Sequence, residues 1–129
     1  MNMMRLLIFA LLLANAAFAQ QKNAVEIAGT WEGSSICTVP NSPCHDEHVI
    51  YHFTQDPKDS TKFTVAADKV VNGQEEYMGT LNCVFTASKS ELFCDNPGDW
   101  RFTVTGKSMK GTLVINKQTL YRKVSVEKK

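Results

Sequence analysis

From about residue 30 onward, apolar and polar positions alternate with a period of two along most of the chain. This period is typical of strands with one buried face, whereas an amphipathic helix repeats every three to four positions. Glycine, proline, asparagine and aspartate separate the alternating runs, as turns between strands require. The pattern predicts no substantial helix and eight strands, at residues 30–37, 47–55, 62–70, 74–86, 91–95, 99–105, 108–116 and 119–127.

Such short connections favour an antiparallel up-and-down meander, and curling it into a closed barrel removes both exposed sheet edges. Gly79 is expected to mark a bulge or bend in the long fourth strand. We expect the glycines and alanine on inner faces to leave space inside the barrel, namely Gly33, Ala67, Gly79 and Gly111. The predicted inner rows are Val49, Tyr51, Phe53; Phe63, Val65, Ala67; Trp100, Phe102, Val104; Met109, Gly111, Leu113, Ile115; and Leu120, Arg122, Val124, Val126.

Residues 1–19 have the features of a cleaved secretory signal peptide. Arg5 gives a positive start, residues 6–13 form an apolar run too short to span a bilayer, and Ala17-Phe18-Ala19 is a small-x-small cleavage signal. We therefore expect a secreted or periplasmic protein, with residues 20–129 forming a single domain.

The charge balance argues against nucleic acid as a partner. The whole chain has a formal net charge of +1, and its only basic residue before position 20 is Arg5, so the mature part is neutral. A neutral domain lacks the positive field that phosphate backbones require. Outside the first 19 residues no apolar stretch is long enough to suggest a membrane span.

Four cysteines in an exported chain indicate two disulfides, for which three pairings exist. Cys37 and Cys44 flank the turn-rich stretch 40–43, and Cys83 and Cys94 flank a predicted hairpin loop at 86–90. The midpoint of 83 and 94 falls within that loop, so these two cysteines should face each other across antiparallel strands. We predict the pairs Cys37–Cys44 and Cys83–Cys94.

All three histidines lie in the stretch Ser-Pro-Cys-His-Asp-Glu-His-Val-Ile-Tyr-His, residues 42–52. His48 and His52 would share a metal ion on a helix, but four strand residues span about 13 Å, which separates them. That leaves the loop residues His45, Asp46, Glu47 and His48, and a weak metal site could involve His45, Asp46 and His48. Alternatively, His45 and Asp46 cap the turn and the later histidines lie on the solvated face. A third interpretation puts this loop at the barrel mouth, where it would contact a ligand or partner.

Arg122 falls on an apolar face and needs a partner, since an unpaired buried guanidinium is costly. Gly29-Thr30-Trp31 opens the first strand, and this Gly-x-Trp together with Arg122 on the last strand resembles the lipocalin and wider calycin pattern. Trp31-Glu32-Gly33 is also similar to lipocalin-like domains of exported bacterial proteins. The resemblance implies that Arg122 packs across the Trp31 indole and that Gly29, Trp31 and Arg122 close the barrel. Avidin-like and fatty-acid-binding-like barrels begin similarly, so the subgroup stays open.

The favoured function is binding of a small apolar or amphipathic molecule, with Tyr51, Phe53, Trp100 and Phe102 lining the cavity. The alternative is a structural or interaction module whose barrel is filled by its own side chains, because eight strands leave room for either. No Gly-x-Ser-x-Gly motif or glycine-rich phosphate loop is present, so we expect no enzyme and no cofactor. We expect a monomer.

Overall fold

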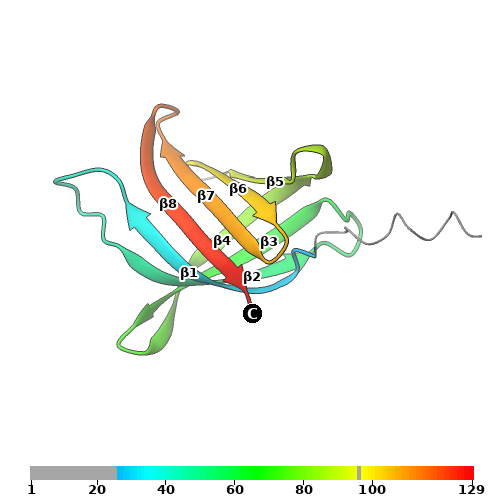
Figure 1. Cartoon of the computed structure of the whole chain (residues 1–129), viewed down its shortest axis with the longest axis horizontal. Helices are drawn as coiled ribbons and strands as arrows, with labels where there is room; N and C mark the ends of the chain where they lie inside the picture. Colours follow the sequence, from blue (N-terminus) through cyan, green and yellow to red (C-terminus); the bar gives the residue numbers. More distant parts are fainter. Residues whose placement is uncertain (1–25, 96) are drawn as a thin grey trace, which may run out of the picture.

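The computed structural model describes residues 26–95 and 97–129, which form one all-β unit (Figure 1). Its helical content is the short 3₁₀ turn η1 (Ala87–Lys89) within this part of the chain, and none of the described helices is long and apolar enough to cross a membrane. The strands are β1 (Gly29–Cys37), β2 (Glu47–Gln55), β3 (Lys62–Val71), β4 (Gln74–Thr86), β5 (Glu91–Asp95), β6 (Asp99–Thr105), β7 (Ser108–Ile115) and β8 (Thr119–Lys128). Each predicted strand boundary is correct to within one residue.

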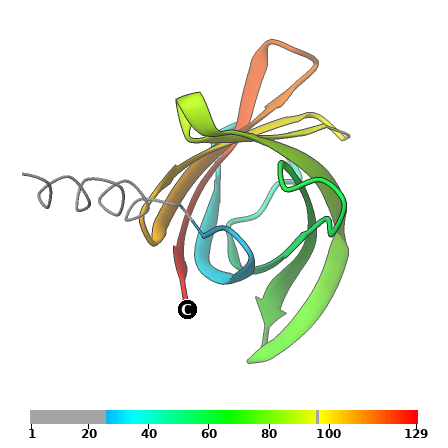
Figure 2. The ribbon, with the colours of Figure 1, turned by 90° about the vertical axis from the view of Figure 1, so that its right-hand side faces the viewer.

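Each strand pairs antiparallel with the next, and β8 pairs with β1, so the sheet closes into a barrel in the order β1 to β8. Figure 2 shows this ring of strands. The closing pairs run from Trp31 opposite Lys128 to Cys37 opposite Arg122. The predicted eight-stranded meander barrel is confirmed, and the fold is consistent with a calycin-like architecture. Closure pairs the two sheet edges that an open meander would leave exposed.

Two bulges interrupt the regular pairing. In β4, Ala67 pairs with Gly79 and Asp68 pairs with Tyr77, so Met78 is an extra residue beside the glycine that predicted the bend. In β8, Leu113 pairs with Arg122 and Val114 pairs with Leu120, leaving Tyr121 as the extra residue. Because of the second bulge, Leu120 lies on the outer face, and 37% of this residue is exposed. The expectation that Leu120 lies inside is therefore wrong, because simple alternation does not extend across a bulge.

The core consists mainly of the predicted inner rows, and its completely buried members include Trp31, Val49, Leu92 and Met109. Two glycines do not leave the space that we expected. A Cβ on Gly33 would lie 2.0 Å from the Ser125 carbonyl oxygen, so this position allows close approach of β1 and β8. A Cβ on Gly111 would lie 2.3 Å from Phe102 Cδ1, so the phenylalanine ring already occupies that space.

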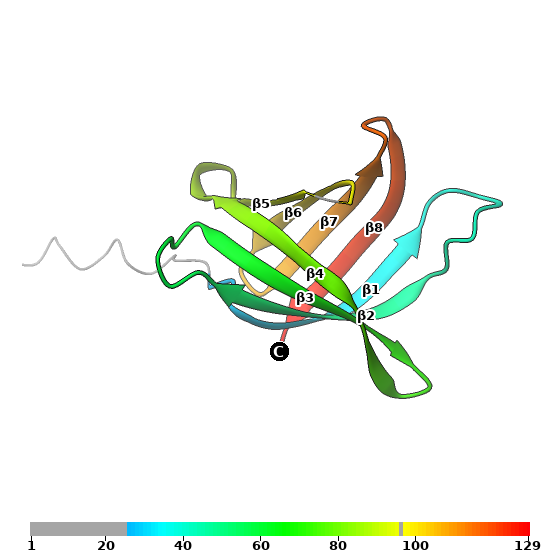
Figure 3. The same cartoon turned by 180° about the vertical axis from the view of Figure 1, so that it is seen from behind.

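The two ends of the barrel differ. We call the end at the start of β1 the Trp31 end, where the β2–β3 and β4–β5 connections lie. The β1–β2 loop and the β3–β4 and β7–β8 hairpins extend from the other end in different directions, and we call this end the Arg122 end (Figure 3). At the Trp31 end, Ile27 precedes β1, is only 2% exposed and joins the core cluster.

Both predicted disulfides are present. Cys37–Cys44 closes the loop between β1 and β2, and Cys83–Cys94 joins directly paired residues of β4 and β5. These crosslinks suit an oxidising compartment. The predicted signal peptide, residues 1–19, lies outside the described residues.

Candidate functional site

The four aromatic side chains proposed to contact a ligand lie together inside the barrel. Tyr51 is edge-on to both Phe53 and Phe102, with ring centroids 6.5 and 6.2 Å apart. Trp100 stacks on Phe102 with an interplanar angle of 5°. Tyr51, Phe53 and Phe102 are at most 4% exposed. Their mutual contacts therefore fill the middle of the barrel with aromatic rings.

Arg122 points inward at the Arg122 end and is held by residues of β1, the β1–β2 loop and β2. Nη1 donates to the Ser35 hydroxyl at 3.2 Å and to the His45 carbonyl at 3.0 Å. Nη2 forms an ion pair with Glu47 Oε1 at 3.3 Å, with 12% of the arginine and 21% of the glutamate side chain exposed. The Ser35 hydroxyl, the His45 carbonyl and the Glu47 carboxylate therefore together provide the partner that a buried guanidinium requires.

The expected stacking of Arg122 on Trp31 is wrong. In the β1–β8 pairing these residues lie six positions apart along the strand, a separation of about 20 Å. The cation over the Trp31 ring is Lys128, whose Nζ lies 5.9 Å from the ring centroid. Trp31 also donates its indole N–H to the Ile27 carbonyl at 2.8 Å. Trp31 and Arg122 thus occupy opposite ends of the barrel.

Gly29 lies at the Trp31 end, as the first residue of β1, and pairs with Phe53. Its φ of +130° is in a region that side chains rarely adopt, and an added Cβ would lie 3.1 Å from Lys128 Cε. Glycine at this position therefore permits the positive φ with which the backbone enters β1.

The buried hydroxyl of Tyr51 lies close to the Arg122 group. Burial raises the pKa of Tyr51 above its usual value of 10.0, and the Glu47 carboxylate raises it further, whereas Arg122 and a hydrogen bond with Ser35 oppose the shift. The tyrosine is consequently neutral at physiological pH and keeps its proton for hydrogen bonding.

Trp100 brings a second donor to this end. Its indole Nε1 is buried and has no hydrogen-bond partner among the described residues. Trp100 pairs with Leu113, and Leu113 pairs with Arg122, so the three side chains lie side by side on β6, β7 and β8. Since adjacent strands are about 4.8 Å apart, the backbones of Trp100 and Arg122 are about 10 Å apart. Sequence alternation identified Trp100 as inward-facing but not its unpaired N–H.

The residues of the proposed loop metal site have separate contacts. Asp46 Oδ1 accepts the Cys37 backbone N–H at 2.8 Å, which is the capping role given as the alternative. His48 points outward and its Nε2 lies 2.6 Å from Glu32 Oε1. His45 contributes its backbone carbonyl to Arg122. Among the described residues, the group with metal-ligand spacing does not include His45, Asp46 or His48.

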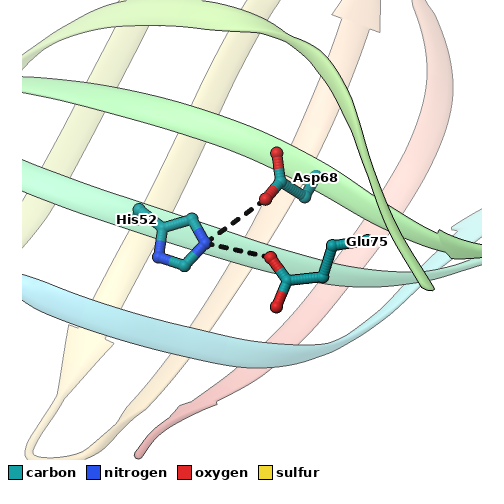
Figure 4. A group of neighbouring side chains, drawn as sticks. All are labelled: His52, Asp68 and Glu75. Carbon is teal, nitrogen blue, oxygen red and sulfur yellow. Dashed lines mark hydrogen bonds and ion pairs between the residues drawn. The ribbon is translucent and has the colours of Figure 1, made fainter. Parts of the chain in front are cut away.

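That group consists instead of His52, Asp68 and Glu75, whose ligand atoms all lie within 4.8 Å of one another (Figure 4). They come from β2, β3 and β4 and lie on the outer face of the barrel. Sequence analysis predicted that His52 points outward but did not identify its two acidic neighbours. The alternation of β3 already indicated an outward Asp68, whereas Glu75 required knowledge of the β3–β4 register.

A groove of about 510 Å³ lies away from these groups, at the Trp31-end portions of β2, β3 and β4. Its lining includes Gln55, Phe63, Asn82 and Val84 but none of the four ligand-candidate aromatics. It also contains no group with metal-ligand spacing within the described residues. This groove does not coincide with the Arg122 end, which contains the buried Trp100 N–H and the largely buried Arg122 side chain.

No family model matches this sequence, and no curated protein matches it.

Proposed function

We propose that this protein is an exported, non-catalytic, lipocalin-like barrel that binds a small amphipathic molecule at its Arg122 end. The ligand would place a hydrogen-bond-accepting polar end beside Trp100 and Arg122 and an apolar part against the aromatic rings. The disulfides and the calycin-like architecture are compatible with this function. The protein would act as a monomer and would not bind nucleic acid.

The buried, unpartnered N–H of Trp100 is the observation that carries the proposal. Leaving a buried donor unpaired costs about 1–3 kcal/mol, so such groups in proteins commonly serve a ligand or an ordered water. Arg122 supplies positive charge on the same face, two strands away. An acceptor such as a carboxylate, sulfonate or carbonyl would satisfy the N–H and gain from that charge.

Barrel mouths are frequent ligand sites because they combine an apolar interior with a few polar groups near solvent. Tyr51 has both properties, since its ring belongs to the aromatic group and its hydroxyl lies near Arg122 and Glu47. The described residues contain no further arginine on an inner face, because Arg101 is 55% exposed and pairs with Glu91 on the outside. The site is therefore proposed to recognise polarity at one end of the ligand only.

Titration with anilinonaphthalene sulfonate tests the proposal, since this fluorescent probe joins apolar rings to an anionic acceptor. We expect saturable fluorescence at one site per chain. Trp100→Phe should weaken binding by about threefold to tenfold through loss of one hydrogen bond. Arg122→Met should weaken it by about tenfold or more through loss of a charged donor.

Arg101→Met is the matched control, because it removes an arginine that also pairs with a glutamate but lies outside the barrel. It should leave probe affinity unchanged. If no saturable binding occurs, or if Arg101→Met weakens binding as much as Arg122→Met, the ligand-binding proposal fails. The protein would then be better described as an interaction module with a filled barrel.

A further inference from the structure

We propose that His52, Asp68 and Glu75 form a zinc site on the outer wall of the barrel. This site is independent of the proposed ligand site, because its three side chains point away from the interior. The cation would join β2, β3 and β4 where the β3–β4 hairpin leaves the barrel (Figures 3 and 4).

Two of the three ligand-to-ligand separations match a tetrahedral site, and the third, between the two carboxylate oxygens, is within 4.8 Å. His52 Nε2 lies 3.3 Å from Asp68 Oδ2 and 3.4 Å from Glu75 Oε2. Zinc bonds of about 2.0–2.1 Å to nitrogen and oxygen give tetrahedral ligand–ligand separations of about 3.3–3.4 Å. A zinc ion fits between these atoms when the two carboxylate oxygens also take this separation. The fourth position would be open to water.

A neighbouring side chain on β1 orients the imidazole. Thr30 Oγ1 lies 3.3 Å from His52 Nδ1, and the two residues are direct partners in the β1–β2 pairing. When Nδ1 carries the ring proton and donates it to the threonine hydroxyl, Nε2 has a free lone pair facing the carboxylates. Such a contact fixes both the tautomer and the ring direction of a metal-binding histidine.

The β4 bulge accounts for the position of the third ligand. In the part of β4 that follows the bulge, odd-numbered residues such as Cys83 face the core. The extra residue Met78 reverses this alternation, so Tyr77 pairs with the outward Asp68 and Glu75 also faces outward. Glu75 is thereby directed toward His52. Bulges commonly redirect a side chain at a functional position in this way.

The donor set favours zinc over the alkaline-earth cations. Calcium and magnesium prefer a full set of oxygen ligands, whereas an imidazole with two carboxylates suits zinc and related transition metals. Asp68 is 15% exposed, while the side chains of His52 and Glu75 are 42% and 49% exposed. An ion could thus enter from solvent without opening the barrel.

Calorimetric titration of the metal-free protein with zinc chloride tests the site. We expect one zinc ion per chain, with no comparable binding of magnesium or calcium. His52→Gln and Asp68→Asn should each reduce zinc affinity by at least the roughly tenfold loss that is typical of changing an outer-shell partner, because each replaces a direct ligand with a weaker neutral amide. In nitrogen-edited NMR spectra of the imidazole rings, the His52 Nε2 resonance should shift as zinc is added.

His48→Gln provides the matched control, since His48 is on the same strand and face but has only one carboxylate neighbour, Glu32. Its zinc affinity should equal that of the unmodified protein. Circular dichroism will confirm that each variant retains the barrel. Undiminished zinc binding in His52→Gln, or loss of binding in His48→Gln, would overturn the proposal, as would a titration of the unmodified protein that shows no binding at all.

Discussion

The two tryptophans lie at different levels of one barrel and have opposite hydrogen-bonding states. Trp31 is completely buried, donates its N–H to Ile27, and has an edge-to-face contact with Phe53. Trp100 is partly buried, stacks on Phe102, and its N–H has no acceptor among the described residues. The first ring satisfies its polar atom within the fold, and the second does not.

This difference extends to the surroundings of each ring. Near Trp31, Ile27 and the core side chains close the barrel, and Lys128 lies across the indole with its ammonium group bonded to the Glu26 carbonyl. Near Trp100, the interior face carries Arg122 with its partners Glu47 and Ser35. The comparison shows that core side chains and Ile27 cover the Trp31 end, whereas the Arg122 end contains the unpartnered Trp100 N–H on which the proposed ligand site rests.

Replacing Trp31 with alanine should cause the largest loss of stability. The change removes a completely buried indole and leaves a void at the Trp31 end. A decrease of about 3–5 kcal/mol in the free energy of unfolding is typical of such a change. Urea denaturation measures this decrease. A loss below about 1 kcal/mol would contradict the assignment of Trp31 to the closing core, since that size is typical of exposed positions.

Replacing Arg122 with methionine should have the next largest effect on stability. Methionine keeps most of the aliphatic volume but leaves Glu47 and the Ser35 hydroxyl without their shared donor. We expect a loss of about 1–3 kcal/mol in the free energy of unfolding, measured in urea. Glu47→Gln is the control and should lose less, since glutamine keeps an acceptor. Equal stability of Arg122→Met and the parent protein would show that these contacts contribute nothing.

The strand pattern was predictable because the alternation of side chains is a local property and the turns contain characteristic residues. Short connections then made the meander the simplest topology, and closure followed from the need to pair its edges. The disulfide Cys83–Cys94 was predictable for the same reason, since a hairpin loop centred between two cysteines sets them opposite each other. The Tyr121 bulge has no adjacent glycine, so Leu120 was wrongly placed inside.

The contacts of the polar side chains were less predictable, because they depend on the relative positions of strands. Alternation showed that Arg122 faces inward. The predicted antiparallel first and last strands also put Trp31 and Arg122 near opposite ends of the barrel, so the partner that the family resemblance suggested conflicted with the strand order. For His52, alternation gave the outer face correctly. Its approach to Glu75 depends on a register across three strands and on the extra residue at Met78.

Alkaline pH should reveal the buried hydroxyl near Arg122. The pKa of Tyr51 is raised in the folded protein, mainly by burial, above the value of 10.0 expected for an unfolded chain. The folded state therefore holds the phenolic proton more tightly, so this contribution to stability is fully present below pH 10 and decreases as the pH rises above it. Urea denaturation between pH 8 and about pH 11 measures this decrease. In the Tyr51→Phe variant, the free energy of unfolding should decrease less over this pH range. If the variant and the parent protein show the same pH dependence, Tyr51 is not the group responsible.

The smallest expected effect is the difference in stability loss between Trp31→Phe and Trp100→Phe, two conservative replacements. Trp31→Phe leaves the buried Ile27 carbonyl without its donor, which should lower the free energy of unfolding by about 1–3 kcal/mol. Trp100→Phe removes a donor that has no acceptor among the described residues and preserves an aromatic ring on Phe102. Its effect should be smaller by about 1 kcal/mol or more, because no acceptor is left unpaired. Urea denaturation of ligand-free protein measures both variants. Equal losses would mean that the Trp100 N–H is satisfied within the fold, and the contrast between the two rings, together with the recognition role of the Arg122 end, would lose its basis.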